Sequence, residues 1–404
     1  MSGESHAGGR APRARRVLVT ASTLPPMAGG SAKMLRNLLA PFPSGSLVYV
    51  RGNNDMFPEA QDAPLGPAVA VDMPNVFRRR GSRISLSRYL EYLWVPWSAW
   101  RMARVARREK VSAVFANYPF GFFLVAAWLA AKSLRLPLFV YMHSLWEETT
   151  DASVDGWMAH RLEPRIFRDA AAVYAPTRFA IEHYRRKHGL EVRLLPHTVN
   201  LDDAGPEGGA GRKNEEGPHR ILFTGGVYNM NRDALLQMVE AVEKLGPSPD
   251  GRDVRLVVCA PNDPAVLAGI GVRGDRVETR FVDSRTAMRL QKEADILYLP
   301  LAFDTPWKDE VRTVYPTKAV EYLVSGTPIL LHAPGDSYTV HEAREMGWAL
   351  VVDRQDGAAL QGAIARLLTD RPLREELAAG ARSAAEGRDA NRIAAGLARD
   401  LGLL

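Results

Sequence analysis

The sequence has very little cysteine. Cys259 is the only one among 404 residues, which excludes an intrachain disulfide and a cysteine-rich metal site. A chain of this kind fits a reducing compartment, so we predict a cytoplasmic protein and leave peripheral contact with a membrane open. The abundance of Ala, Arg, Gly and Pro suggests a GC-rich bacterial genome.

Long hydrophobic runs are also missing. The most apolar stretch, Pro119 to Ala131, is too short to span a bilayer and is typical of a buried helix. Residues 1–15 are polar and basic, and no apolar stretch of signal-peptide length follows them. We therefore expect a disordered basic arm, with neither a secretory signal nor a membrane span.

Two common ligand-binding signatures are not found. The turn after the first predicted strand contains Gly29 and Gly30 but no G-x-G-x-x-G, which disfavours a dinucleotide site. No Asp-x-Asp motif follows a predicted strand, and Glu147 and Glu148 have no further ligand at metal spacing. We expect no metal ion and no cofactor.

Positive charge is unevenly distributed along the chain. The net charge is +6, and residues 78–110 contain ten Arg or Lys against two Glu, interleaved with Tyr and Trp. Such a segment could lie on an anionic membrane surface or bind an acidic ligand. The alternative is a pair of helices, broken near Pro96, whose aromatic side chains pack on a sheet and whose arginines are solvated. We expect no nucleic-acid binding, because no known binding module accompanies the charge.

The pattern of the whole chain predicts an α/β fold. The hydrophobic content of 46% and charged content of 24% fit a globular protein, and the length favours two domains. Short apolar, β-branched runs alternate with helical patterns from end to end, as in doubly wound parallel sheets. Strands are predicted at 16–22, 46–50, 111–117, 137–143 and 171–176, and again at 220–226, 254–260, 277–283, 294–300, 327–333 and 348–353. Helices are predicted, among others, at 31–39, 177–187, 373–386 and 389–401.

A polar, Gly- and Pro-rich stretch divides the two series of strands. Residues 200–220 have no apolar period and read as a linker. We predict two Rossmann-like domains that face a central cleft. The predicted boundaries are a basic arm at 1–15, an N-terminal domain at 16–200, a linker at 201–218, a C-terminal domain at 219–385 and a terminal helix at 386–404 that could cross back to the N-terminal domain.

Ligands of such sheets bind beyond the carboxyl ends of the strands, and three loops there carry candidate groups. Gly29, Gly30 and Ser31 open a helix whose N–H groups could face an anion, or they form only a tight turn. His143 ends a strand and could bond a hydroxyl, or it is a satisfied surface histidine. Gly225, Gly226 and Arg232 could hold a phosphate, or they form a capped helix start with a solvated Arg.

A fourth loop carries the most informative pattern. In "VRTVYPTKAVEYLVSGTPILLHAP" a short helix begins near Thr317 and stops at Gly326. Val320, Leu323 and Val324 form its core-facing stripe, while Lys318, Glu321 and Ser325 share the opposite face. Glu321 could accept both hydroxyls of a ribose; the alternative is an exposed i,i+3 Lys–Glu pair.

Together these segments resemble the GT-B glycosyltransferases, in the retaining branch marked by an E-x7-E motif. The resemblance rests on "PPMAGG" (25–30), on residues 161–200 and on residues 347–382. The most specific match is "EYLVSGTPIL" (321–330), which is similar to the family's EA-x-A-x-G-x-P-V.

The resemblance implies a role for each candidate. Glu321 would bind the ribose of a nucleotide sugar, His143 would contact the transferred sugar, and Lys318 would contribute with them to catalysis. The N-terminal domain would take the acceptor beside Gly29, Gly30 and Ser31, and the C-terminal domain would take the donor. The implied donor-binding residues are Gly225, Gly226, Arg232, Val282, Thr313, Val314, Tyr315, Thr317 and Glu321.

The chain departs from the family pattern at three positions. Thr313 stands where the first motif Glu is expected, and Gly226 and Asn231 stand where the family has a phosphate-binding Arg and Lys. The basic residues that could compensate are Arg232, Lys308, Arg312 and Lys318.

The implied function is a retaining glycosyltransferase. It would move a sugar from a nucleoside diphosphate sugar to a hydroxyl acceptor, either a small molecule or a lipid-linked one, without a metal ion. Two alternatives stay open. The replaced Glu allows a non-catalytic GT-B-like partner or nucleotide-binding subunit, and the same fold could serve a nucleotide-sugar epimerase.

Overall fold

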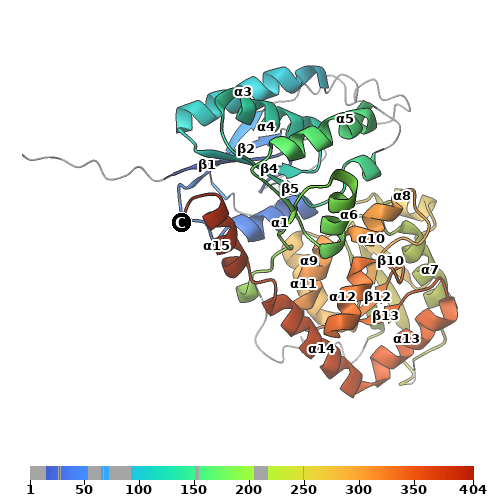
Figure 1. Ribbon diagram of the computed structural model, residues 1–404. Helices are drawn as coiled ribbons and strands as arrows, with labels where there is room; N and C mark the ends of the chain where they lie inside the picture. Colours follow the sequence, from blue (N-terminus) through green and yellow to red (C-terminus); the bar gives the residue numbers. More distant parts are fainter. Residues whose placement is uncertain are drawn as a thin grey trace, which may run out of the picture.

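The structure is a computed structural model that describes residues 15–25, 27, 29–52, 65–66, 68–71, 92–150, 154–203, 217–248 and 250–404. Residues 1–14 of the predicted arm, residues 78–91 of the basic segment and residues 204–216 of the predicted linker lie outside these ranges. The described chain forms two α/β domains, each on a parallel sheet, which confirms the predicted fold class (Figure 1).

The first domain is built on a parallel sheet with the strand order β3-β2-β1-β4-β5-β6-β7. Its strands are β1 (Val17–Ala21), β2 (Leu47–Gly52), β3 (Ala68–Val71), β4 (Ala113–Tyr118), β5 (Leu138–Met142), β6 (Ala172–Ala175) and β7 (Arg193–Leu194). The order reverses at β1 and β4, which are hydrogen-bonded neighbours. In doubly wound sheets a ligand crevice opens at such a reversal.

Helices cover both faces of this sheet. One face carries α3 (Val95–Glu109), α4 (Gly121–Leu134), α5 (Val154–Asp169) and α6 (Arg178–His188), and the other carries α1 (Gly30–Leu39) and α15 (Ala390–Asp400). Successive side chains of β1 alternate between them, since Leu18 packs with the first group while Val17 and Val19 pack with the second. This double coverage explains the continuous hydrophobic runs of the strands.

The second domain repeats the plan with the strand order β10-β9-β8-β11-β12-β13. Its strands are β8 (His219–Thr224), β9 (Val254–Cys259), β10 (Val277–Arg280), β11 (Ile296–Pro300), β12 (Ile329–His332) and β13 (Leu350–Val352). Its helices are α7 (Arg232–Glu243), α8 (Pro264–Gly269), α9 (Ser284–Glu293), α10 (Lys308–Thr313), α11 (Thr317–Leu323), α12 (Tyr338–Met346), α13 (Gly357–Thr369) and α14 (Arg371–Glu386). Outside this domain, the described chain also has short 3-10 turns. These are η2 (Tyr92–Trp94) and η3 (Glu147–Thr149) in the first domain, and η4 (Leu201–Asp203) just after it.

The predicted strands and named helices all correspond to elements of the structure. The apolar stretch at 119–131 lies in the buried helix α4, as predicted. Strands β3 and β7 were not predicted: β7 is a two-residue exposed strand, and β3 is a four-residue run of Ala and Val directly after Pro67. Pro96 lies in the first turn of α3, where its missing N–H costs no hydrogen bond, and the 3-10 turn η2 precedes it. The helix predicted before Pro96 falls largely on residues outside the described ranges.

The chain passes between the domains twice at one place. Val199 leaves the first domain and forms an isolated parallel bridge with Asp389, where the chain returns. The returning helix α15 then packs against α1 and the first sheet, and the Tyr174 hydroxyl donates to the Asp400 carboxylate at 2.7 Å. Figure 1 shows α15 beside β1 and α1 beside α9 and α11. In the part of the chain that the structure describes, no helix combines the length and the apolar character needed to cross a membrane.

Candidate active site between the two domains

Helix α1 follows the predicted acceptor-side loop, and helix α11 follows a predicted donor-binding loop. The two helices begin opposite each other. Gly30 is the first residue of α1, and Thr317 is the first residue of α11. A Cβ atom at Gly30 would lie 2.6 Å from the Thr317 hydroxyl oxygen, which is too close for any side chain. Gly29, with φ 129°, turns the chain into α1, and the Ser31 hydroxyl accepts a 3.4 Å hydrogen bond from Asn117. The structure thus brings together two loops that the sequence placed in opposite domains.

Glu321 lies at this junction and is held from both domains. Its Oε1 atom forms a 2.8 Å ion pair with Lys33 of α1, and its Oε2 atom accepts a 3.2 Å hydrogen bond from Gln291 of α9. The Glu321 side chain keeps 19% of its surface exposed. Among the described residues its ion-pair partner is therefore Lys33, and not Lys318 one turn away on the same helix.

Lys318 points toward the end of β8. Its Nζ atom lies 4.3 Å from the centre of the Phe223 ring, and a Cβ atom at Gly225 would meet it at 2.9 Å. Gly225, with φ 123°, is thus required both for its backbone conformation and for the space that Lys318 fills. Burial lowers the pKa of Lys318 to about 8, against the attraction of the Glu321 carboxylate.

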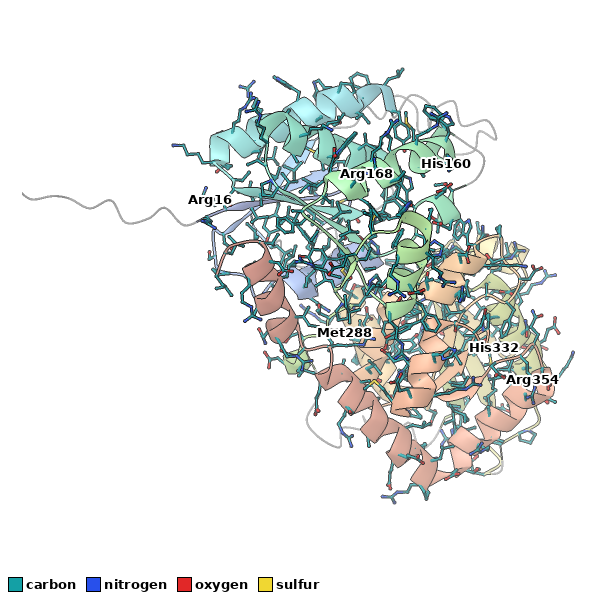
Figure 2. All side chains as sticks on the ribbon, in the orientation of Figure 1. Arg16, His160, Arg168, Met288, His332 and Arg354 are labelled. Atoms are coloured by element: carbon teal, nitrogen blue, oxygen red, sulfur yellow. The ribbon has the colours of Figure 1, made fainter. Side chains whose placement is uncertain are left out.

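A pocket opens beside Glu321 at the meeting of α1, α9 and α11. Lys33 and Asn37 come from the first domain, and Gln291 and Lys292 come from α9. The rest of the lining is Val199, Met288, Val320, Glu321, Val324 and Ser325. Figure 2 labels Met288 near the level at which the two domains meet. The pocket combines an apolar wall with one carboxylate, two carboxamides, two amines and one hydroxyl.

His143 follows β5 and is buried. Its Nε2 atom has no hydrogen-bond partner, and its ring lies 6.2 Å from the ring of His197. Burial lowers the pKa of His143 to about 4, so the imidazole is neutral at pH 7. A neutral ring with an unpartnered nitrogen can bond a ligand hydroxyl.

The backbone before α11 is tied to neighbouring elements. The Thr313 hydroxyl donates to the Asp309 carbonyl at 2.8 Å, and the Thr313 carbonyl accepts from Thr177 of the first domain at 2.6 Å. The Val314 carbonyl accepts from Thr339 at 2.9 Å, and Tyr315 is fully buried with the Arg388 guanidinium 3.8 Å from its ring centre. The side chains of Thr313 and Tyr315 are therefore engaged within the protein.

Glu310 lies one turn before Thr313 on α10 and reaches across the domain junction. Its carboxylate accepts the Leu145 N–H at 2.7 Å, two residues after His143. It is buried, and burial raises the pKa of Glu310 to about 7 although the Leu145 N–H acts in the opposite direction.

The loop after β8 is closed by Asn231. The Asn231 carboxamide donates to the Gly226 carbonyl at 3.0 Å and accepts the Tyr228 N–H at 3.1 Å. Arg232 begins α7 and is exposed. Val282 lies between β10 and α9, partly buried against the core of the second domain. Lys308 is exposed, and Arg312 is half-buried on α10.

Three residues at the junction were missed from the sequence: Lys33, Gln291 and Glu310. Lys33 follows the Gly29–Gly30 turn by one helical turn, and this spacing was an available signal. Gln291 lies in a polar stretch, and nothing local marks it as buried.

Two protein-family models match the chain, one over each domain. Residues 47–203 match a family model described as Glycosyltransferase Family 4, and residues 218–370 match one described as Glycosyl transferases group 1. No curated protein sequence matches the chain significantly.

Several solved structures are similar over nearly the whole chain. Sucrose-phosphate synthase from Thermosynechococcus elongatus has a TM-score of 0.70 at 17% identity, over 95% of this chain and 98% of that one. Anabaena HepE in complex with UDP and glucose has a TM-score of 0.67 at 13% identity, over 96% and 100%. An alpha,alpha-trehalose-phosphate synthase (UDP-forming) from Burkholderia vietnamiensis has a TM-score of 0.64 at 16% identity, also over 96% and 100%. With a family 4 domain followed by a group 1 domain, the chain belongs to the glycosyltransferases of the GT-B fold.

Proposed function

We propose that the protein transfers a sugar from a nucleoside diphosphate sugar to a hydroxyl acceptor, with retention of configuration at the anomeric carbon. The observation that carries this proposal is the meeting of α11 with the start of α1 at the domain junction. Glu321 pairs there with Lys33 and Thr317 approaches Gly30, while Lys318 of the same helix lies at the end of β8. Glu321 and Lys318 lie within one helical turn of each other, and Glu321 lines a partly apolar pocket. The carboxylate suits the ribose of a donor and the ammonium suits its diphosphate. The related structure of Anabaena HepE was solved with UDP-glucose, and this supports a donor of that class.

In the proposed reaction the bond between the anomeric carbon and the diphosphate oxygen breaks. The acceptor oxygen bonds to the same face of the sugar, and its proton passes to the departing phosphate oxygen. Lys318 offsets the charge that develops on the leaving group, while the neutral His143 orients a sugar hydroxyl. Positioning and charge stabilisation supply most of the rate in such a step, and we propose that no metal ion takes part.

We further propose that the outer side of the first domain, at α3, contacts an anionic membrane surface. Leu93 and Trp100 are 70% and 54% exposed. The Arg101 and Arg104 guanidiniums lie 5.1 and 5.5 Å from the rings of Trp97 and Trp100, respectively. Mixed tryptophan and arginine along one helix suit the interface between headgroups and acyl chains.

The test is donor turnover. Purified protein is incubated with UDP-, GDP- and ADP-sugars, free sugar is measured as slow hydrolysis, and the anomeric configuration of the product is read by NMR. We expect one donor class to be consumed, with Glu321→Gln and Lys318→Met at least tenfold slower. Glu375→Gln, on the exposed surface of α14, is the matched control.

Unchanged turnover in both site variants would contradict the assigned residues. Inversion of configuration would contradict the retaining mechanism. Binding of nucleotide without turnover would instead favour the non-catalytic alternative.

A further inference from the structure

Gln291 is a buried polar side chain that has no role in the function proposed above. It lies on α9 and is 2% exposed. Its amide nitrogen donates to Glu321 Oε2 at 3.2 Å and to the Thr224 hydroxyl at 3.0 Å. A carboxamide nitrogen carries two hydrogens, so both are used in these contacts.

The same Gln291 nitrogen also anchors the side chain to the strand that leads into the site. Thr224 is the last residue of β8, and its N–H donates to the Tyr322 hydroxyl at 3.0 Å. The main-chain carbonyl of Gln291 accepts from the Thr327 hydroxyl at 2.7 Å, which ties α9 to the turn after α11. The Gln291 carboxamide thus connects Glu321 to the end of β8, and the α9 backbone that carries it is itself held in place.

The effect of this contact on Glu321 follows from the geometry of a carboxylate. Rotation about the last torsion of a Glu side chain is soft, yet two adjacent hydroxyls can both donate only when both carboxylate oxygens face them. A neutral donor on Oε2 restrains that rotation without cancelling the negative charge. Lys33, on Oε1, has a flexible stem and can yield its place to a ligand.

We propose that Gln291 is a positioning residue that orients the Glu321 carboxylate toward the two hydroxyls of a ribose. This inference rests on the proposed function, because it takes the ligand of Glu321 to be a nucleoside diphosphate. Gln291 itself need not touch the ligand. Its role appears in the preference for a ribonucleotide over a 2′-deoxyribonucleotide, which a merely structural residue would leave unchanged.

The experiment compares two ligands by calorimetry. The best-binding nucleoside diphosphate among UDP, GDP and ADP is measured beside its 2′-deoxy form. We expect wild-type protein to prefer the ribonucleotide about tenfold, as for one charge-assisted hydrogen bond. The preference should disappear in Glu321→Gln and in Gln291→Leu. Gln361→Leu on α13, which removes a single 3.0 Å bond to the Ala241 carbonyl, should keep it.

A second variant, Gln291→Glu, tests the proposal even if Gln291→Leu does not fold. Gln291→Glu keeps the size of the side chain but lacks a donor when ionised. We expect it to lose the ribose preference at pH 8 and to regain it near pH 5.5, where a shared proton again supplies a donor.

The possible results separate this inference from the proposed function. A ribose preference that persists in Gln291→Leu, or in Gln291→Glu at pH 8, overturns the positioning role alone. Wild-type protein that binds none of the nucleotides overturns the proposed function, and this inference with it.

Discussion

The pKa values of three side chains at the domain junction are shifted by the same physical cause. Burial disfavours the charged form, which lowers the pKa of Lys318 to about 8 and that of His143 to about 4, and raises that of Glu310 to about 7. At pH 7 the histidine is therefore neutral and the lysine is mainly charged. Small changes of pH near neutrality alter the charge of Glu310, which accepts the main-chain N–H of Leu145 in the other domain.

Glu310→Gln should change how stability depends on pH. Because the pKa of Glu310 is raised on folding, the native state holds a proton that the unfolded state releases between about pH 4.5 and 7. The contribution of Glu310 to the free energy of unfolding is full below this window. It falls by about 1.4 kcal/mol per pH unit as the pH rises through it.

Urea unfolding of wild type and Glu310→Gln between pH 5 and 8 measures this effect. We expect the difference between the two proteins to shift in favour of the variant as the pH rises, since a neutral amide can be buried without ionising. Parallel stability curves over that range would show that Glu310 does not titrate there.

Lys318 should give nucleotide binding its own pH dependence. The ammonium attracts a diphosphate only while it is protonated, and the pKa of about 8 belongs to the free protein. We expect the dissociation constant of the preferred nucleoside diphosphate to rise up to tenfold per pH unit above pH 8. In Lys318→Met, binding should be weaker at pH 7 and insensitive to pH between 8 and 9; a wild-type affinity equal at pH 7 and 9 would contradict the assignment.

At the scale of elements, α3 differs from the other surface helices. Figure 1 shows it at the outer edge of the first domain, on the side away from the second domain. Its only acidic residue, Glu109, is paired with Arg16 and Arg108 at 3.0 and 2.9 Å. The other charged residues of α3 are arginines. Their attraction to an anionic membrane and the exposed Trp100 side chain would therefore both favour membrane binding.

Replacing residues on α3 should therefore weaken binding to anionic vesicles. Each basic residue near a charged membrane contributes about 1 kcal/mol, so Arg104→Glu should lower the partition coefficient about tenfold or more, and Trp100→Ala should lower it less. Co-sedimentation with phosphatidylglycerol-containing vesicles, against vesicles of phosphatidylcholine alone, is the measurement. Lys244→Glu, an exposed charge reversal after α7, is the control, and equal loss in it would show that only net charge matters.

At the scale of the whole molecule, the two domains are in close contact. Gly30 approaches Thr317, Glu310 accepts the Leu145 N–H, and Thr177 donates to the Thr313 carbonyl. These contacts surround the junction at which donor and acceptor would meet. Movement of one domain relative to the other would change several of them together, as in hinge closure around a ligand.

Gly30→Ala should hold the domains apart. The added methyl would lie 2.6 Å from the Thr317 hydroxyl oxygen, so the Thr317 side chain or one helix start has to shift. We expect a larger radius of gyration by small-angle scattering and at least tenfold lower donor turnover, because small displacements of reacting groups cost large factors in rate.

The matched control is Gly357→Ala. Gly357 is also the first residue of a helix, α13, and a Cβ atom there meets nothing within 4 Å. Unchanged scattering and turnover in Gly30→Ala would indicate that the close approach is not needed for function.

Much of the fold could be predicted because its signals are local. Continuous apolar runs such as that of β11 are required wherever helices cover both faces of a sheet. Glu321 was found in the same way, since the stripe of Val320 and Leu323 and the stop at Gly326 define one helix and its exposed face. The strands β3 and β7 were not recovered, because β7 is two exposed residues without an apolar run and β3 is a short Ala and Val run directly after a proline.

The sequence by itself determined the two parallel sheets, their order along the chain and the helix that carries Lys318 and Glu321. Only the tertiary structure decided which groups meet there. The partners of Glu321 are Lys33 and Gln291, one from almost the other end of the chain and one from a polar helix with no marking motif. Local periodicity determines which face of a helix is buried, but the distance between two charged atoms depends on how whole domains pack against each other.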